Sequence, residues 1–239
     1  MQNRFIDKLG HYVALSEAEV DALTRATSTS RKINTKTDLI REGDRPGPVF
    51  VMLEGWAMRY KVLPNGSRQI MAFLMPGDAC DLHIGLLAQM DHSIQTITPA
   101  RVATISRTHM DELLDRYRGI AKAMYIAQLA DEGTLRAWIV SMGRRSSIER
   151  VAHLICELFV RARGGDLTST TFEIPFSQII LADALGMTPV HINRMLRELR
   201  TRDIISLRRG SMSVINPSAL ASVAGFDENY LHRRARSPA

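Results

Sequence analysis

The sequence predicts an α+β fold, with a strand-rich N-terminal region, a long helix near the middle and a helical C-terminal region. Glycine turns recur at even spacing in the first half, a proline-free helical stretch follows, and the positive charge after that stretch comes from arginine alone. The chain has 239 residues, of which 45% are hydrophobic and 23% charged, as expected for one or two packed domains. This composition excludes the disordered, collagen-like and disulfide-stapled classes.

Residues 30–107 are predicted to be short strands joined by turns. The apolar segments there have β-type composition, and turn glycines separate them at intervals of 12, 11 and 11 residues. These glycines are Gly43, Gly55, Gly66 and Gly77. Evenly spaced turns in a run of short strands are typical of a sandwich or a barrel. Asn65-Gly66 is the strongest hairpin signal, and we expect a positive φ at both of its residues.

Residues 117–142 are predicted to form one long helix, because they lack proline and carry a narrow stripe of mostly apolar residues at steps of three and four. The stripe consists of Ile120, Met124, Ala127, Asp131, Leu135, Trp138 and Met142. Its near-heptad spacing predicts a dimer seam, and Asp131 would cost less at a partly wet seam than in a core. The alternative is a helix that covers the β region of its own chain.

A second helical region is predicted after a hinge at 143–145. Ser146 with Glu149 three residues later is a capping-box pattern, and Gly164-Gly165 predicts the end of the helix. Before Gly143 the chain has 17 Lys+Arg and 16 Asp+Glu, a net charge of +1; from Gly143 onward it has 14 and 9, a net charge of +5. All 14 cations are arginine, which contacts phosphate and guanine bidentately. The charge therefore indicates a nucleic-acid module in this region.

Residues 176–199 carry the most specific pattern. Ser177 can cap a first helix that ends at Gly186, and Thr188-Pro189 can begin a second one as N-cap and first helical residue. The inward face of the second helix is predicted to be Ile192, Met195, Leu196 and Leu199. This spacing is that of a helix-turn-helix.

The outward face of that second helix suits a DNA groove. We expect Arg194 to contact guanine, Val190 a thymine methyl group and Arg197 a phosphate. A hairpin over 204–215 follows, with arginines at its turn, which predicts a wing beside the groove. The predicted DNA-binding residues are Ser177, Gln178, Thr188, Pro189, Val190, His191, Asn193, Arg194, Arg197, Arg208 and Arg209. The alternative is a helical hairpin with a solvated charged face.

On these motifs the chain resembles the CRP/FNR family, the catabolite activator and fumarate-nitrate regulators. The resemblance covers roughly residues 15–220 and is most specific in the helix-turn-helix. The residues that carry it are 41–44, 53–55, 64–66, 76–78 and 181–194. It implies an N-terminal β-roll, which is a double-stranded β-helix or jelly roll, a long dimerisation helix and a C-terminal winged helix-turn-helix.

The resemblance also implies domain limits and partners. The expected domains are a cyclic-nucleotide-binding-like effector domain over 1–116, the dimerisation helix over 117–142, the DNA-binding domain over 143–225 and a flexible tail over 226–239. It implies a homodimer on double-stranded DNA whose half-sites lie about 34 Å apart, with RNA polymerase as a further partner and a small-molecule effector.

The effector segment departs from the family's cyclic-nucleotide branch. That branch needs an acid for the ribose and an arginine for the cyclic phosphate, but the second of these places here reads Asp91-His92-Ser93. Tight binding of cyclic AMP is therefore not expected, and the effector and any cofactor stay unknown. The predicted effector-pocket residues are Cys80, Asp81, Leu82, His83, His92 and Ser93.

Other sensing chemistries are limited by ligand count. An iron–sulfur cluster needs four cysteines, and the sequence has only Cys80 and Cys156. The alternatives left open are a haem or redox sensor that uses the Cys80–His92 segment, and a constitutive DNA binder with a degenerate effector domain. No metal site is predicted.

Enzyme and membrane classes are not expected. The sequence has no nucleophile elbow, phosphate-binding Walker loop or zinc-protease motif. It also has no run of eighteen apolar residues and no secretory leader, which predicts a cytoplasmic protein.

Overall fold

The computed structural model describes residues 3–80, 87–163, 171–172, 174–175, 177–208 and 211–233. The chain divides into two compact units. The first contains residues 1–67, 71–132 and 231–239, and the second contains 68–70 and 133–230. No helix in the described ranges is long and apolar enough to cross a membrane.

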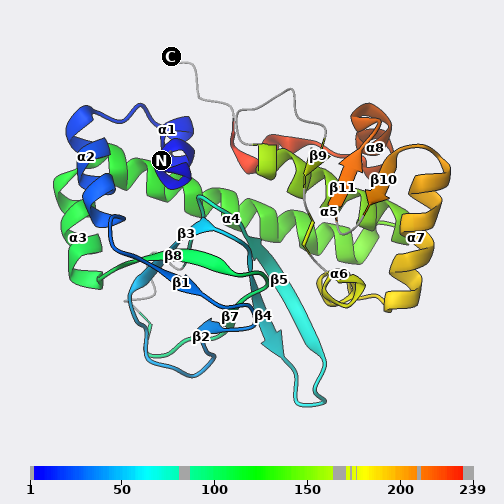
Figure 1. Cartoon of the computed structure of the whole chain (residues 1–239), viewed down its shortest axis with the longest axis horizontal. Coiled ribbons are helices and arrows are strands. Elements are labelled where there is room, and N and C mark those ends of the chain that lie inside the picture. Colours follow the sequence, from blue (N-terminus) through cyan, green and yellow to red (C-terminus); the bar gives the residue numbers. More distant parts are fainter. Residues whose placement is uncertain are drawn as a thin grey trace. The chain divides into compact units, whose positions relative to one another are not determined.

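Two four-stranded sheets form the centre of the first unit (Figure 1). One has the order β1-β8-β3-β6 and the other β2-β7-β4-β5. The strands are β1 Ser30–Ile33, β2 Asp38–Ile40, β3 Val49–Glu54, β4 Ala57–Val62, β5 Arg68–Leu74, β6 Ala79–Cys80, β7 Ser93–Thr96 and β8 Ala100–Ile105. Antiparallel pairing of β3 with β6 and β8, and of β7 with β2 and β4, agrees with the predicted β-roll.

Strand β3 separates two apolar cores because its side chains alternate between the faces of the sheet. Phe50 and Met52 pack into a core between the sheets, which also contains Ile94 of β7. Val49 and Val51 pack on the opposite face, against four helices. These helices are α1 Arg4–Tyr12, α2 Glu17–Ala26, α3 Arg107–Arg116 and the first part of α4 Arg118–Arg144 (Figure 1).

The four predicted turn glycines all have a positive φ, at +88°, +80°, +81° and +101° for Gly43, Gly55, Gly66 and Gly77. The expected turn type at Asn65-Gly66 is wrong, because Asn65 is not among the residues with positive φ. Instead the Leu63 amide donates to the Ser67 carbonyl oxygen at 2.8 Å and the Gly66 amide to that of Leu63 at 2.8 Å. The loop has three residues and needs only one left-handed position, which Gly66 occupies.

The second unit is helical, with a small sheet of order β10-β11-β9. Besides the end of α4, its helices are α5 Ser147–Arg163, α6 Gln178–Leu185, α7 Pro189–Thr201, α8 Pro217–Ala224 and the 3-10 helix η2 Glu228–Leu231. Its strands are β9 Thr171–Phe172, β10 Ile205–Arg208 and β11 Ser211–Val214. The predicted cap of α5 is present, since the Ser146 amide donates to Glu149 Oε2 at 2.7 Å.

A buried carboxyl group organises the core of this unit. Glu157 is fully buried and accepts hydrogen bonds from Trp138 Nε1 at 2.9 Å and the Tyr230 hydroxyl at 3.2 Å. Arg161 Nη1 lies 3.1 Å from its other oxygen. Since Tyr230 is bonded there and its ring contacts that of Phe226, the predicted flexible tail is wrong at these two residues, which are packed rather than free. Residues 234–239 lie outside the described part of the chain.

The predicted dimer seam on α4 needs correction. Ile120 and Met124 are buried in the helix-covered core of the first unit, and Trp138 is buried beside Glu157 in the second. Side chains buried within one chain offer no surface to a second copy, so the seam is wrong at these three positions. Ala127, Asp131 and Met142 are half-buried. The large apolar side chains that α4 exposes are Tyr125, Leu129, Leu135, Ile139 and Val140.

Candidate nucleic-acid interface

The helix-turn-helix forms with the predicted caps. Ser177 Oγ accepts from the Ile180 amide at 3.4 Å at the start of α6, and Gly186 ends that helix with φ +61°. Thr188 Oγ1 accepts from the His191 amide at 3.2 Å, and Pro189 is the first residue of α7. These contacts satisfy backbone groups that a helix end leaves unpaired, and they define the turn between α6 and α7.

The inward face of α7 is confirmed. The four predicted residues, Ile192, Met195, Leu196 and Leu199, are all buried. On α6, Leu181, Ala182, Ala184 and Leu185 are buried as well. The small side chains of Ala182 and Ala184 let the two helices approach closely, so α7 is held by packing and its opposite face is left to solvent.

Arg150 holds two helix ends together, a role that the sequence did not reveal. Its Nη1 donates to the Leu185 carbonyl oxygen of α6 at 3.0 Å, and its Nη2 to the Met142 carbonyl oxygen of α4 at 3.1 Å. A guanidinium suits this position because the C-terminal ends of helices carry partial negative charge. Its partners belong to other helices, so the spacing within α5 gave no signal for this role.

The outward face of α7 is exposed and mixed in chemistry. Val190 is 78% exposed, and Arg194 and Arg197 are exposed on the same side of the helix. Arg194 Nη2 lies 3.0 Å from His191 Nε2 one turn earlier. An exposed valine flanked by arginines matches an apolar contact beside hydrogen-bond donors, which is the chemistry of a thymine methyl group beside guanine or phosphate.

The charge on this side is partly compensated within the helix. Arg202 is ion-paired with Glu198, whereas Arg200 is exposed. The positive charge available to a partner on this helix is therefore concentrated in Arg194, Arg197 and Arg200 rather than spread over every arginine.

The wing is an antiparallel hairpin of β10 and β11, in which Leu207 lies opposite Met212, and β9 adds a third strand. Arg208 is the last residue of β10. Arg209 lies outside the described residues.

The predicted effector residues are not brought to one place by the described part of the chain. Cys80 is buried in the core between the sheets, with Ile94. Ser93 precedes Ile94 in β7 and so faces the other side of the sheet. His92 is nearly buried, and its Nδ1 lies 2.6 Å from Asp91 Oδ1, a hydrogen bond that lowers the pKa of Asp91. Asp81, Leu82 and His83 lie outside the described residues.

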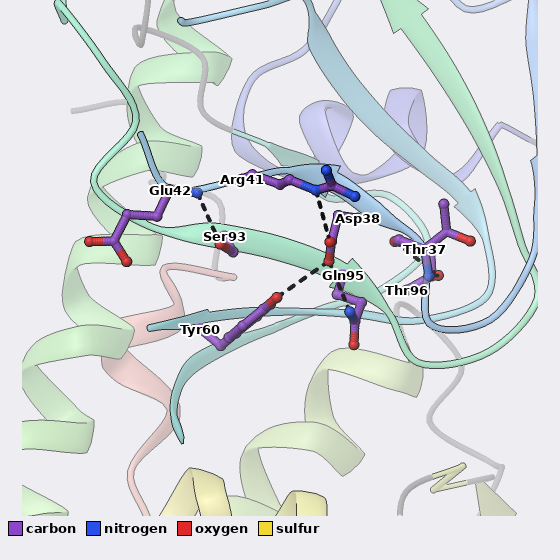
Figure 2. Close-up of polar contacts among 8 residues, drawn as sticks. All are labelled: Thr37, Asp38, Arg41, Glu42, Tyr60, Ser93, Gln95 and Thr96. Carbon is purple, nitrogen blue, oxygen red and sulfur yellow. Dashed lines mark hydrogen bonds and ion pairs between the residues drawn. The ribbon is translucent and has the colours of Figure 1, made fainter. Parts of the chain in front are cut away.

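Figure 2 shows the Ser93 hydroxyl near a separate group of polar contacts that Asp38 makes with residues of β4 and β7. The Ser93 hydroxyl accepts from the Glu42 amide at 3.0 Å. Asp38 accepts from Gln95 Nε2 at 2.8 Å, Arg41 Nε at 3.1 Å and the Tyr60 hydroxyl at 3.3 Å. These bonds join the three strands where the β2–β7 register shifts, so the geometry supports a structural role for Ser93.

Arg59 is a cation of the first unit that sequence reasoning missed. It lies directly opposite Ile94 in the β4–β7 pair, and opposite residues share a face of a sheet. Ile94 is fully buried in the core between the sheets. The strand alternation around residues 57–62 was the signal that could have identified an arginine on the inner face.

Comparisons with known families match both units. The model of the cyclic nucleotide-binding domain matches residues 30–117, and that of the Crp-like helix-turn-helix domain matches residues 149–223. The chain is 26% identical to a probable transcriptional activator of Rhizobium leguminosarum bv. viciae, over 81% of this chain and 80% of that protein. It is 27% identical to the nitrogen fixation regulation protein FixK of Rhizobium meliloti, over 78% and 82%.

Solved structures agree in fold. The structure of FixK2 from Bradyrhizobium japonicum has a TM-score of 0.73 and 21% identity, covering 83% of this chain and 98% of that one. A CRP-family transcriptional regulator from Thermus thermophilus has a TM-score of 0.63 and 19% identity, covering 82% and 97%. With the two domains in the order that the sequence predicted, this chain belongs to the CRP/FNR family of transcriptional regulators.

Proposed function

We propose that this regulator binds a two-fold symmetric DNA site as a homodimer, with α7 in the major groove. The observation that carries the proposal is the outward face of α7, where exposed Val190, Arg194 and Arg197 lie on a helix fixed by its buried side. In this assignment Arg194 hydrogen-bonds a guanine, Val190 contacts a thymine methyl group and Arg197 contacts a phosphate. The caps of α6 and the wing residues Arg208 and Arg209 contact the backbone beside the groove.

The test begins by selecting bound sequences from a random DNA pool with the full-length protein. On the selected site, Arg194→Ala is expected to cost about 1 to 3 kcal/mol of specific binding and to relax the preference at one base pair. Arg208→Ala is expected to weaken all sequences alike and to reduce the salt slope by about one unit. Both effects are measured by gel-shift titration at several salt concentrations.

Arg25→Ala is the matched control, because it removes the same exposed charge from α2 in the first unit. It should leave both the base preference and the salt slope near those of the unmodified protein. Full discrimination by the Arg194→Ala protein would show that α7 is not the recognition helix.

The dimer contact proposed here is the exposed apolar side of α4. Tyr125 and Ile139 are fourteen residues apart, two heptads, and Leu129 lies close to the line between them. A second copy of the chain would bury these side chains by pairing α4 with α4. Such a dimer would carry two copies of α7, one for each half-site of a symmetric DNA site whose half-sites lie about 34 Å apart.

For the effector, we propose a small molecule that binds the first unit and is not cyclic AMP. Anionic compounds are the first candidates for this ligand, because the positively charged Arg59 lies on the inner face of β4. A thermal-shift series with nucleotides, organic acids, haem and oxidants should raise the melting temperature for a ligand of the folded state. The rival function, constitutive DNA binding with a degenerate effector domain, predicts no shift with any of them.

The place of action and the second partner follow from DNA binding. We infer that the regulator works in the cytoplasm, where the DNA is, and that it influences RNA polymerase there. An in vitro transcription assay on a promoter that carries the selected site checks this. Transcription that is unchanged by the protein would contradict it.

A further inference from the structure

One side-chain contact joins the two helices of the helix-turn-helix at the surface. Asn193 Nδ2 donates a hydrogen bond to Gln178 Oε1. Gln178 is the first residue of α6, Asn193 is the fifth of α7, and both are exposed. Neither residue is needed for the core, so the contact has no role in packing.

Asn193 lies on the side of α7 that faces DNA in the proposed function. At 100° per residue it is about 60° around the helix from Val190 and about 100° from Arg194. These two neighbours offer DNA no hydrogen-bond acceptor. Val190 offers no hydrogen bond and Arg194 only donates, whereas Asn193 supplies an acceptor as well.

In the structure the Gln178 oxygen is the acceptor of this bond, so the nitrogen is the end of the Asn193 amide that faces Gln178. A carboxamide has one oxygen and two N–H donors, and the Gln178 oxygen can accept only from the nitrogen. One N–H of Asn193 is therefore engaged, while its oxygen and second N–H stay available. An acceptor beside a donor is the complement of adenine in the major groove, where N7 accepts and the N6 amino group donates.

We propose that Asn193 reads an adenine in each half-site, next to the base read by Arg194, and that Gln178 is its positioning residue. This inference rests on the proposed function. Without the bond to Gln178, the Asn193 side chain would sample several rotamers and both amide orientations, and DNA binding would have to order it. The bond to Gln178 orders the Asn193 amide before binding. It therefore favours adenine over bases that present other patterns of hydrogen-bond donors and acceptors.

The experiment uses the full-length protein and the DNA site that it selects. Each adenine of the half-site is replaced in turn by 7-deazaadenine, which lacks the N7 acceptor, and affinity is measured by fluorescence anisotropy. At one adenine the unmodified protein should lose affinity by about 5- to 150-fold, the range expected when the buried N–H of Asn193 is left without its acceptor. Asn193→Ala should bind the natural site less tightly and should no longer distinguish the analogue there.

The Gln178 variants separate positioning from direct contact. Gln178→Ala should reduce discrimination at that same adenine only, and the double variant with Asn193→Ala should be no worse than Asn193→Ala alone. Gln178→Glu keeps an oxygen for Asn193 Nδ2 and should retain the discrimination, although its charge weakens binding to all sequences. Asn229→Ala removes an exposed amide from η2 and should change nothing.

The outcomes distinguish this inference from the proposed function. If the unmodified protein selects no sequence, both fail. If it selects a site on which Arg194→Ala relaxes specificity while Asn193→Ala discriminates every adenine analogue fully, only the role of Asn193 is overturned. A uniform loss of affinity for Gln178→Ala, with discrimination intact, would make Gln178 a backbone contact rather than a positioning residue.

Discussion

At the scale of single residues, Gly55 and Gly66 have almost the same backbone conformation but different surroundings. Their φ angles are +80° and +81°. A Cβ atom on Gly55 would lie 2.4 Å from the Pro99 carbonyl oxygen and 2.8 Å from Ala100 Cα, whereas one on Gly66 would meet nothing within 4 Å. Gly55 therefore serves both the turn and a close approach of two backbone segments, and Gly66 serves the turn alone.

Alanine at the two positions should consequently have unequal effects. Gly66→Ala should reduce the free energy of unfolding by about 1 to 2 kcal/mol, the usual penalty for a left-handed alanine. Gly55→Ala should cost about 3 kcal/mol or more, because backbone atoms must also move. Urea unfolding of both variants measures the difference, and equal costs would show that the Pro99 contact is unimportant for stability.

At the residue scale, prediction from sequence succeeded where a side chain contacts residues that are close to it in the chain. The caps at Ser177 and Thr188 and the left-handed Gly186 involve residues within a few positions, and the structure has them as expected. Arg150 could not be assigned in this way. Its partners belong to the ends of two helices, and the packing that brings those ends together is not visible in local spacing.

At the scale of elements, α4 exposes a different face from the one that periodicity selected. The predicted stripe is apolar because it packs on the chain's own cores, as Ile120 and Trp138 do. Both faces of α4 carry apolar residues at heptad-like spacing, so the pattern alone could not tell the inner face from the outer one. Exposure identifies the outer face, where Ile139 is 71% exposed.

Ile139→Asp should therefore convert the proposed dimer into monomers. A carboxylate within an apolar helix pair cannot be desolvated without a large cost, and pairing would bring two of them together. Sedimentation velocity at micromolar concentration measures the result. Leu135→Asp, at the edge of the exposed side, should weaken the dimer less.

The control for this prediction is Val20→Asp, which places the same charge on an exposed aliphatic position of helix α2. It should sediment like the unmodified protein. A dimer that survives Ile139→Asp would exclude α4 pairing as the assembly contact.

At the scale of the whole molecule, pH acts on stability through two buried groups of the second unit. Burial raises the pKa of the Glu157 carboxyl group, against the opposing effect of Arg161. Burial also lowers the pKa of His153 to about 4, helped by the charge of Arg145. The His153 ring stacks on Tyr230, with centroids 5.9 Å apart, so both groups respond to the docking of the C-terminal segment.

Removing the Glu157 charge should stabilise the protein increasingly as pH rises. The unfolded chain loses this proton near the ordinary glutamate pKa, while the folded chain keeps it to higher pH, so stability falls as pH rises through that window. The advantage of Glu157→Gln over the unmodified protein should therefore grow from about pH 4.5 upward. Urea unfolding in a Trp56→Phe background, followed by Trp138 fluorescence, measures it.

His153→Phe should show the opposite slope. Folded His153 resists protonation between its ordinary pKa near 6.5 and its folded value of about 4, so the unfolded state binds the extra proton and stability falls as pH is lowered. The variant should gain on the unmodified protein over this range, by at most about 3 kcal/mol. Parallel curves for the variant and the unmodified protein would mean that His153 is not buried as a neutral ring.

The sequence alone predicted the order of the elements and the local chemistry. The glycine turns, the helix caps, the helix-turn-helix spacing and the arginine-only charge all depend on residues that are near neighbours in the chain. These features also indicated the family. Three features were decided by tertiary packing: the outward face of α4, the docking of Tyr230 on Glu157, and the separation of Cys80 from Ser93 by the plane of a sheet. Each depends on which segments distant in sequence cover a given side chain. Side-chain spacing reports that a face is apolar, but only the packed structure shows whether the chain itself or a partner buries it.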